Sequence, residues 1–454
     1  MKGKVTDLGT LRVPRLFKNY FIPTLFGMLC MSAVTAIDGI FVGYGIGSDG
    51  IAAVNICSPL LMIFTGIALM LGVGSSVIAS INLSRGKVKI ARLNITQALV
   101  FITVLTLFSS ILILIFPKET AYLLGSSDEL LPMVTDYLVW FVPGLTLQMW
   151  IAIALFTIRL DGSPRIAMWC SIIAGVVNVV LDWVFIFPLG WGIMGAAFAT
   201  TISFVAGGLC AVSYLLFFAK KLRLCPVKMN WKNISRSIKD IRNQCHIGSS
   251  ALLGEATLAI LMFVGNQVFM KYLGDDGVGA FGVACYYTPF IFMVGNAIAQ
   301  SAQPIISYNF GVGNQERVNS ARRIALLTAT VCGFLAMAMF VFFPKQMVSL
   351  FLNPENAAAQ IAIKGLPFLA LGFIFFIINL TVIGYYQSIE KVNYATSFAL
   401  LRGIIILIPC FFVMPQFLGT EGIWLAMPVS EVMTSFVILC CCISHCIRKA
   451  HLTT

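Results

Sequence analysis

Long apolar runs dominate this chain of 454 residues and restrict the folds that are open to it. Most runs reach about 20 residues, which is the length an α-helix needs to cross the roughly 30 Å hydrocarbon core of a bilayer. Only 11% of the residues are charged, whereas soluble domains carry about 25%. A membrane β-barrel would instead show segments of about ten residues with alternating polarity, which the sequence lacks. The pattern therefore predicts an all-α integral membrane protein.

Charged and turn-forming residues divide the sequence into twelve apolar segments, each predicted to be one transmembrane helix. The predicted helices are 19–43, 51–80, 94–116, 133–158, 166–187, 194–219, 246–273, 278–308, 322–343, 361–388, 395–414 and 421–446.

The basic residues lie almost entirely on one side of these helices. Of the 30 Lys and Arg residues, all but Lys118, Lys271, Lys345 and Lys364 fall on the side of the N-terminus. Cytoplasmic loops are enriched in Lys and Arg, and an even number of helices returns the chain to its starting side. Both termini are therefore predicted to be cytoplasmic, in a multi-pass protein of the plasma or inner membrane. Topology and anionic lipid headgroups account for the net charge of +12, so no nucleic-acid partner is expected.

The second half of the chain repeats the first at a constant offset of 227 residues. Phe116-Pro117-Lys118 recurs as Phe343-Pro344-Lys345, and Gly195 recurs as Gly422. Each half holds six predicted helices. Because six is even, the halves share one orientation and are related by pseudo-two-fold symmetry along the membrane normal.

The repeat divides the chain into an N-terminal six-helix lobe at 1–219, a cytoplasmic connector at 220–245 and a C-terminal six-helix lobe at 246–454. Two lobes of this kind complete the fold within one chain, so a monomer is expected. Transporters built from repeats bind their substrate between the repeats.

Four of the 18 acidic residues fall inside predicted helices, namely Asp38, Asp182, Glu255 and Glu431. A carboxylate at the bilayer centre costs at least about 2.5 kcal/mol, so each is a candidate functional group. At 1.5 Å per residue, Asp38 and Asp182 reach similar depths, and Asn178 lies one turn before Asp182 on the same face. Two neighbouring carboxylates in a low dielectric cannot both stay charged at low cost. We therefore predict that they share a proton or bind a monovalent cation.

Glu255 and Glu431 are predicted near the midplane of the second lobe. The offset of 227 places uncharged residues at the positions equivalent to all four acids, so the lobes share a scaffold but not their polar chemistry. Arg402, at the start of a predicted helix, is expected to extend its side chain to the aqueous interface. The sequence shows no metal-ligand spacing and no catalytic motif, so we predict no metal, no organic cofactor and no enzymatic activity.

Several motifs together resemble the multidrug and toxic compound extrusion (MATE) family of secondary transporters. They are Asp38 in the first predicted helix, the Gly-x-Gly-x-Ser segment Gly72–Ser76, Arg85-Gly86-Lys87, Asn178-x-x-x-Asp182 and the Gly-Ala-Ala-x-Ala-Thr element at 195–200. The resemblance implies two lobes that form a V opening inward and outward. It also implies cation-coupled export of amphiphilic, often cationic, compounds.

The resemblance further implies the site residues. It assigns Asp38, Asn178 and Asp182 to a cation site in the first lobe. Glu255, in Gly-Glu-Ala-Thr-Leu, matches a second-lobe acid that some members use for sodium. The tenth predicted helix carries Asn379 but no acid where sodium-linked members are expected to have one. We therefore favour the proton over sodium as the coupling ion, and keep Glu255, Glu431 and Asn379 as candidates for a substrate or second cation site.

Two other functions are open to such a chain. A flippase for a lipid-linked precursor would need several basic residues inside its cavity, and the predicted helices hold almost none. A membrane-embedded enzyme would need clustered catalytic groups near one interface, and the three His residues are scattered. The sequence therefore favours an antiporter that exports drugs or toxic metabolites from the cytoplasm.

Overall fold

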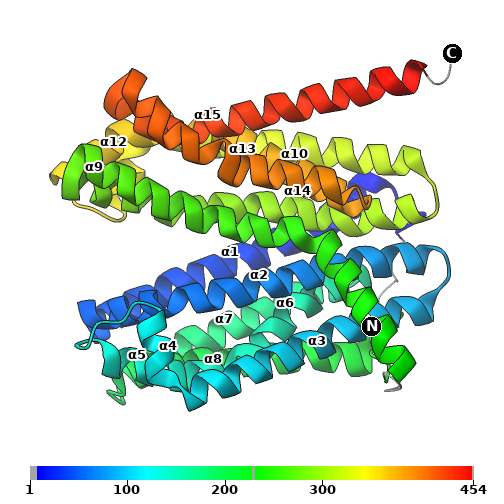
Figure 1. The fold of residues 1–454 in the computed structure, drawn as a ribbon, viewed down its shortest axis with the longest axis horizontal. Coiled ribbons are helices and arrows are strands. Elements are labelled where there is room, and N and C mark those ends of the chain that lie inside the picture. The colour runs from blue at the N-terminus through cyan, green and yellow to red at the C-terminus, as the bar shows by residue number, and fades with distance from the viewer. Residues whose placement is uncertain (1–7, 227–230, 452–454) are drawn as a thin grey trace. The chain divides into compact units, whose positions relative to one another are not determined.

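The computed structural model describes residues 8–226 and 231–451, which fold into helices joined by short loops (Figure 1). These described residues contain no strand. The first half contains α1 (Val13–Gly45), α2 (Ser48–Ser84), α3 (Val88–Ile115), α4 (Pro117–Leu123), α5 (Leu131–Phe141), η1 (Val142–Gly144), α6 (Leu145–Leu160), α7 (Pro164–Ile186), α8 (Gly192–Ser213) and η2 (Tyr214–Phe218). The second half contains α9 (Trp231–Gly311), α10 (Gln315–Phe342), α11 (Pro344–Ser349), α12 (Ala357–Ala370), α13 (Phe373–Ser388), α14 (Val392–Leu400), η3 (Leu401–Ile405) and α15 (Leu407–His451).

The long helices account for the predicted transmembrane segments. In the described part of the chain, nine helices are long and apolar enough to cross a bilayer, and the bent pair of α12 and α13 makes a tenth span. Two of these ten are each broken into two, because Gly274 in α9 (φ 64°) and Gly419 in α15 (φ 57°) adopt left-handed backbone angles. The breaks bring the number to the twelve predicted helices, and the all-α prediction is confirmed.

The backbone itself repeats at the predicted offset. Glycines with positive φ recur as the pairs Gly47 and Gly274, Gly86 and Gly313, and Gly192 and Gly419. The turn at the second pair closes with the same hydrogen bond in both halves. The amide of Lys87 donates to the carbonyl of Asn82 at 2.8 Å, and that of Asn314 donates to Asn309 at 2.9 Å. The duplication therefore extends to the local geometry of the turns.

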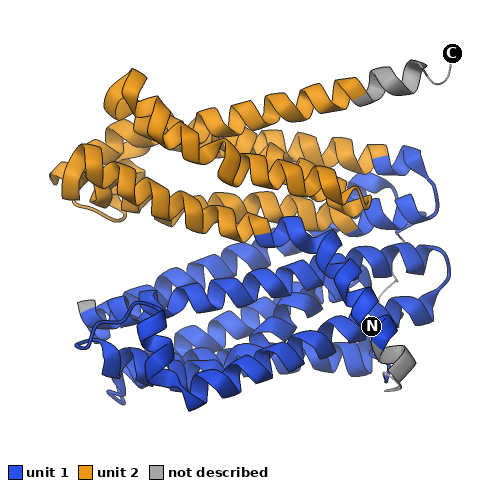
Figure 2. Cartoon of the chain, viewed as in Figure 1, with its two compact units in different colours: residues 1–252, 304–318 blue, residues 253–303, 319–454 orange. Residues whose placement is uncertain are grey.

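The chain divides into two compact units (Figure 2). Unit 1 comprises Met1–Leu252 with Pro304–Val318, and unit 2 comprises Leu253–Gln303 with Asn319–Thr454. The first turns of α9, up to Leu252, therefore belong to unit 1. The predicted lobe boundaries follow the sequence repeat instead, and they stay a prediction. Part of the predicted connector, 227–230, lies outside the described residues.

Within unit 1, α1 packs along α7 through small residues. A Cβ atom added to Gly27 would lie 3.5 Å from Met168, and one added to Gly175 would lie 2.7 Å from Val34. From the first contact to the second, the position moves seven residues along α1 (Gly27 to Val34) and seven residues along α7 (Met168 to Gly175). The two helices therefore run parallel and in register. Small residues permit such close approach between membrane helices. Extending this register carries Asp38 to within about one turn of Asp182.

Asp161 attaches the chain that follows η2 to unit 1. Its carboxylate is only 3% exposed and accepts hydrogen bonds from the backbone amides of Lys220, Lys221 and Leu222 at 2.8, 2.8 and 2.9 Å. The hydroxyl of Tyr214 donates to the same carboxylate at 2.8 Å. Consecutive backbone amides form a concave anion site, so four donors stabilise this buried charge.

We expect Asp161→Asn to lower the free energy of unfolding by about 2–4 kcal/mol, because hydrogen bonds to a charged group contribute about 1.5–3 kcal/mol each. The amide would also point an N–H donor at groups that are themselves donors. Chemical unfolding of the purified protein in detergent measures the change. The exposed Asp136 provides a matched Asp→Asn control, expected to stay within about 0.5 kcal/mol of the native chain. Equal stability of the two variants would contradict the anchoring role.

Candidate functional site

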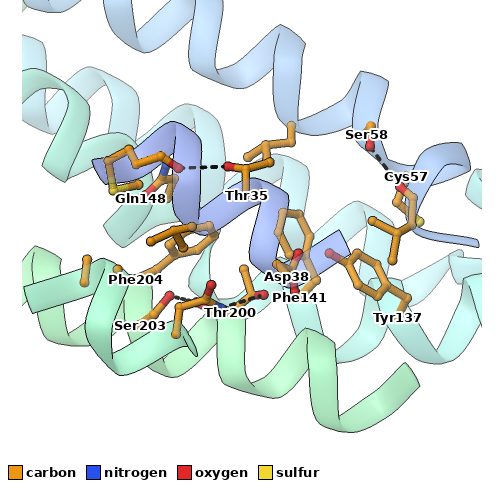
Figure 3. A pocket seen from close by; sticks show the side chains of 17 residues that line it. Thr35, Asp38, Cys57, Ser58, Tyr137, Phe141, Gln148, Thr200, Ser203 and Phe204 are labelled. Atoms are coloured by element: carbon orange, nitrogen blue, oxygen red, sulfur yellow. Dashed lines mark hydrogen bonds between the residues drawn. The ribbon is translucent and has the colours of Figure 1, made fainter. Parts of the chain in front are cut away.

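A cavity of about 180 Å³ lies among the helices of unit 1 (Figure 3). Its walls come from α1, α2, α5, α6, α7 and α8. A volume of this size holds several water molecules. The polar groups of its lining include Thr35, Asp38, Ser58, Gln148 and Asn178, and no Lys, Arg or His is found among the described residues that line it. The cavity thus combines an acid with neutral polar groups.

Asp38 and Asp182 meet beside this cavity. Asp182 is fully buried, and Asp38 lines the cavity with its Oδ1 atom buried. The two carboxyl groups interact with each other. No N–H or O–H group of the described residues donates to either oxygen of Asp182 or to Oδ1 of Asp38. Carboxylates only accept hydrogen bonds, so these two can bond to each other only when one of them holds a proton.

Asn178 approaches the same cavity from α7, one turn before Asp182. Its side-chain amide donates to Oγ1 of Thr200 in α8 at 3.5 Å, and that hydroxyl donates to the carbonyl of Ala196 at 3.0 Å. The structure therefore gathers Asp38, Asn178 and Asp182, three residues predicted from the sequence, in one place. Thr200 adds a neutral oxygen to this group.

Tyr137 of α5 is a member of the site that the sequence did not suggest. It is 7% exposed and lines the cavity, and Figure 3 shows its hydroxyl directed toward Asp38. Its electrostatic neighbours include both Asp38 and Asp182. One tyrosine among 12 in an apolar sequence carries no local signal of such a position. The phenol can donate a hydrogen bond to a charged carboxylate or accept one from a protonated carboxyl.

The second unit contains a different polar cluster. Arg402 of η3 donates to Oε1 of Glu431 in α15 through Nε at 3.0 Å and through a terminal nitrogen at 2.7 Å. Asn379 of α13 donates to Oε2 of Glu431 at 2.7 Å, and Ser435 donates to Oδ1 of Asn379 at 2.8 Å. The guanidinium also lies 4.3 Å from the ring centroid of Phe376. The acid of this cluster is therefore neutralised within the protein.

The expectation that Arg402 reaches the aqueous interface is wrong. Its side chain is 1% exposed and forms the ion pair with Glu431. It sits in a π-helical turn, Leu401–Ile405, of the kind that often interrupts helices at functional positions. The turn and the buried acid together keep the guanidinium inside unit 2, because an unpaired charge there would be costly.

Glu255 stands apart from this cluster. It is half-buried in α9 and makes no hydrogen bond or ion pair with another described residue. The structure brings Glu431 and Asn379 together but leaves Glu255 as a separate acid. No group of three or more His, Cys, Asp or Glu side chains in the described residues could hold a metal ion.

Comparison with known proteins identifies the family. The family model MatE matches residues 23–184 and 251–413, one segment in each half of the repeat. The chain belongs to the MatE family. This confirms the resemblance to multidrug and toxic compound extrusion proteins, and it makes the chain a multi-pass membrane transporter rather than an enzyme.

The relatives and solved structures that this chain resembles match nearly its whole length. An FAD transporter of Shewanella oneidensis is 24% identical, with 94% of each chain covered. The multidrug export protein MepA of Staphylococcus saprophyticus is 22% identical over 91% of this chain and 90% of that protein. An outward-facing multidrug resistance MATE family transporter has a TM-score of 0.87 at 22% identity, with 96% of each chain covered. A MOP superfamily transporter from Pyrococcus furiosus has a TM-score of 0.86 at 21% identity, again covering 96% of each chain. At such identities the structural likeness shows the shared fold.

Proposed function

We propose that this MatE protein is a cation-coupled antiporter that exports amphiphilic, cationic small molecules from the cytoplasm. The observation that carries the proposal is the pair Asp38 and Asp182 beside the cavity of unit 1. No described group donates a hydrogen bond to Oδ1 of Asp38 or to either oxygen of Asp182, and no basic side chain is found in the described lining of the cavity. Such a pair gains most from a small cation, because a proton or a monovalent ion removes the repulsion between two carboxylates. Coupling then follows if the occupied and empty pairs favour different conformations.

Helix α1 is the element through which this site would act. It carries Asp38, and Pro23 lies inside it. A proline removes one backbone hydrogen bond and permits a helix to bend. When the carboxyl pair holds a cation, α1 can keep Asp38 against Asp182. When the pair is empty and charged, repulsion favours an arrangement in which water or a cationic substrate reaches Asp38.

The proton is the coupling ion that we favour. A single proton joins two carboxyl groups directly, whereas sodium needs additional oxygen ligands arranged around it. The acid in the cluster of unit 2 is already bound to Arg402, which argues against a sodium site at Glu431 and Asn379. Asn178, Thr200 and Tyr137 supply neutral oxygens near Asp38, and these are the groups that a sodium ion would use instead.

We expect an imposed pH gradient to drive export in sodium-free buffer. Proteoliposomes with a known pH gradient and a fluorescent lipophilic cation provide the measurement. Addition of substrate should dissipate the gradient, and liposomes without protein serve as the control. Transport that appears only after sodium is added would reverse the assignment of the ion.

The substrate class follows from the charges that the structure leaves uncompensated. The described lining of the unit 1 cavity is acidic, and Glu255 has no partner among the described residues of unit 2. Both features attract cations and resist anions. The relative described as an FAD transporter favours a second candidate, an anionic nucleotide. Arg402 cannot serve such an anion while it is bound to Glu431.

We expect Glu255→Gln to weaken binding of a lipophilic cation about tenfold, because a partly desolvated charge contributes on the order of 1–4 kcal/mol at contact distance. Binding of a neutral analogue of similar shape should change little. Paired binding isotherms for the two ligands on the native chain and the variant measure the difference. The exposed Glu355 offers a matched Glu→Gln control in the same unit. Equal losses for both ligands would remove Glu255 from the substrate site.

The remaining features of the proposal follow from topology. The asymmetry of Lys and Arg supports cytoplasmic termini and a location in the plasma or inner membrane. The repeat supports a monomer. A lipid-linked precursor with a pyrophosphate is a poorer substrate, because no basic side chain lines the described cavity.

A further inference from the structure

The first turns of α9, residues 235–250, have two faces of opposite character. On the inner face, the side-chain amide of Gln97 in α3 donates to Ser237 at 2.9 Å and to Asp240 at 3.2 Å. Gln244, which is fully buried, donates to the carbonyl of Asn94 at 3.0 Å. Positions 237, 240 and 244 recur at the helical spacing of three and four residues, so they form one stripe. This stripe fixes the helix to unit 1.

Glycines allow the same face to close against α2. A Cβ atom on Gly74 of α2 would overlap the carbonyl of Gln244, and one on Gly248 of α9 would overlap the carbonyl of Met70. The inner face is therefore held by backbone contact as well as by hydrogen bonds. Rotation or sliding of these turns would require both to break.

The outer face is basic. Arg236, Lys239 and Arg242 are exposed, and Ile238 between them is 63% exposed. None of these three cations forms an ion pair with a described residue. Asp240, the acid of this stretch, is turned to the inner face and bound by Gln97. The exposed face thus carries positive charge without compensation.

A second basic segment is attached to the same end of α3. Nε of Arg92 donates to the carbonyl of Lys221 at 2.7 Å, and the amide of Cys225 donates to the hydroxyl of Thr96 at 3.2 Å. Arg92 and Gln97 are five residues apart on α3, which is about 7.5 Å along the helix. The backbone at the exposed Lys221 and the first turns of α9 are therefore both bound to the same part of α3. We call Lys221, Arg236, Lys239 and Arg242 the basic collar.

We propose that the basic collar is a binding site for the headgroups of anionic phospholipids, with Ile238 inserted at the boundary of the acyl chains. A helix with a basic face and an exposed apolar side chain is the pattern that binds at a membrane interface. The chain spans a bilayer, so lipid is the anionic partner that is always within reach. The fixed inner face makes the collar a preformed site, which binds a limited number of lipids rather than a diffuse cloud of counter-charge. This site is separate from the proposed transport function.

Phosphatidylglycerol titrated into the full-length protein in phosphatidylcholine nanodiscs provides the test. Native mass spectrometry counts the bound lipids, and saturable binding is expected. The triple substitution Arg236→Gln, Lys239→Gln and Arg242→Gln should weaken it on the order of a hundredfold, since each surface cation contributes several-fold. The matched control is Lys118→Gln, Lys345→Gln and Lys364→Gln, which removes three exposed charges at the other predicted side of the membrane. An equal effect of the two triple variants would overturn the proposal.

The substitution Gln97→Leu distinguishes a preformed lipid site from attraction of lipids by net charge. It keeps every charge of the collar but removes the hydrogen bonds that hold Ser237 and Asp240. A built site then binds phosphatidylglycerol more weakly, whereas attraction by net charge alone stays unchanged, and an unchanged affinity would overturn the proposal. Ser237→Ala removes only one of these bonds and repeats the comparison if Gln97→Leu does not fold. Soluble glycerol phosphate that competes as well as the lipid, or equal binding of phosphatidylcholine, would also overturn it.

Discussion

Replacement of Asp38 or Asp182 by Asn is expected to reduce transport to the background of empty vesicles, while the protein still folds. Asn has nearly the same size as Asp but cannot take up or release a proton. It would also place an N–H donor beside the remaining carboxylate. No described group now supplies such a donor. We therefore expect the variants to lose coupling because the substituted side chain cannot take up and release a proton. The substitution itself should create neither a cavity nor a steric clash.

Proteoliposomes with an imposed pH gradient measure both export of a lipophilic cation and dissipation of the gradient. Asp136→Asn, at an exposed position of the same unit, is the control and should transport normally. Thermal unfolding in detergent verifies that the site variants are folded. Normal export by either purified variant would contradict the proposed role of the pair.

The Arg402–Glu431 pair should show a strong non-additive effect on stability. Arg402→Met alone leaves Glu431 buried without its cation, and Glu431→Gln alone leaves the guanidinium without its anion. Removal of one partner from a buried pair costs about 3–5 kcal/mol, whereas removal of both charges is often nearly neutral. We therefore expect the double variant to be more stable than either single variant. The glutamine that replaces Glu431 in the double variant keeps a carbonyl oxygen that can accept the hydrogen bond from Asn379.

Chemical unfolding of the four proteins in detergent gives the coupling energy directly. Arg323→Met, at an exposed position of α10, is a control for loss of an arginine and should change the free energy of unfolding by less than about 0.5 kcal/mol. If the losses from the two single substitutions simply add in the double variant, the ion pair does not govern the stability of this cluster. Recovery of transport together with stability in the double variant would assign the pair a structural role.

Membership of the MatE family says more about the fold of this chain than about the chemistry of its sites. The relatives include an FAD transporter and a multidrug export protein at nearly the same identity. Relatives of this chain thus differ in what their names say they transport. Under the proposed function, the charges of individual sites select the substrate. The acid of the unit 1 cavity and Glu255, which has no partner among the described residues, are therefore the positions to test first.

The spans, the repeat and the candidates for the first cation site could be predicted from the sequence. A bilayer requires helices of a set length, so apolar runs and their punctuation predict the spans. Asp38 and Asp182 could be paired because depth follows from the rise per residue and an acid in a membrane helix is conspicuous. The offset of 227 residues is visible because the same turns need the same residues, as at Gly86 and Gly313.

Which side chains meet depends on how the helices pack. Depth says how far along its helix a residue lies, but contact also depends on the rotation of each helix about its axis and on its neighbours. Tyr137 joins Asp38 because α5 presents that face to the cavity. Arg402 turns inward because its π-helical turn places the guanidinium against Glu431. These contacts join residues far apart in the chain, so no local pattern records them, and the cost of an unpaired buried charge selects them once the helices have packed.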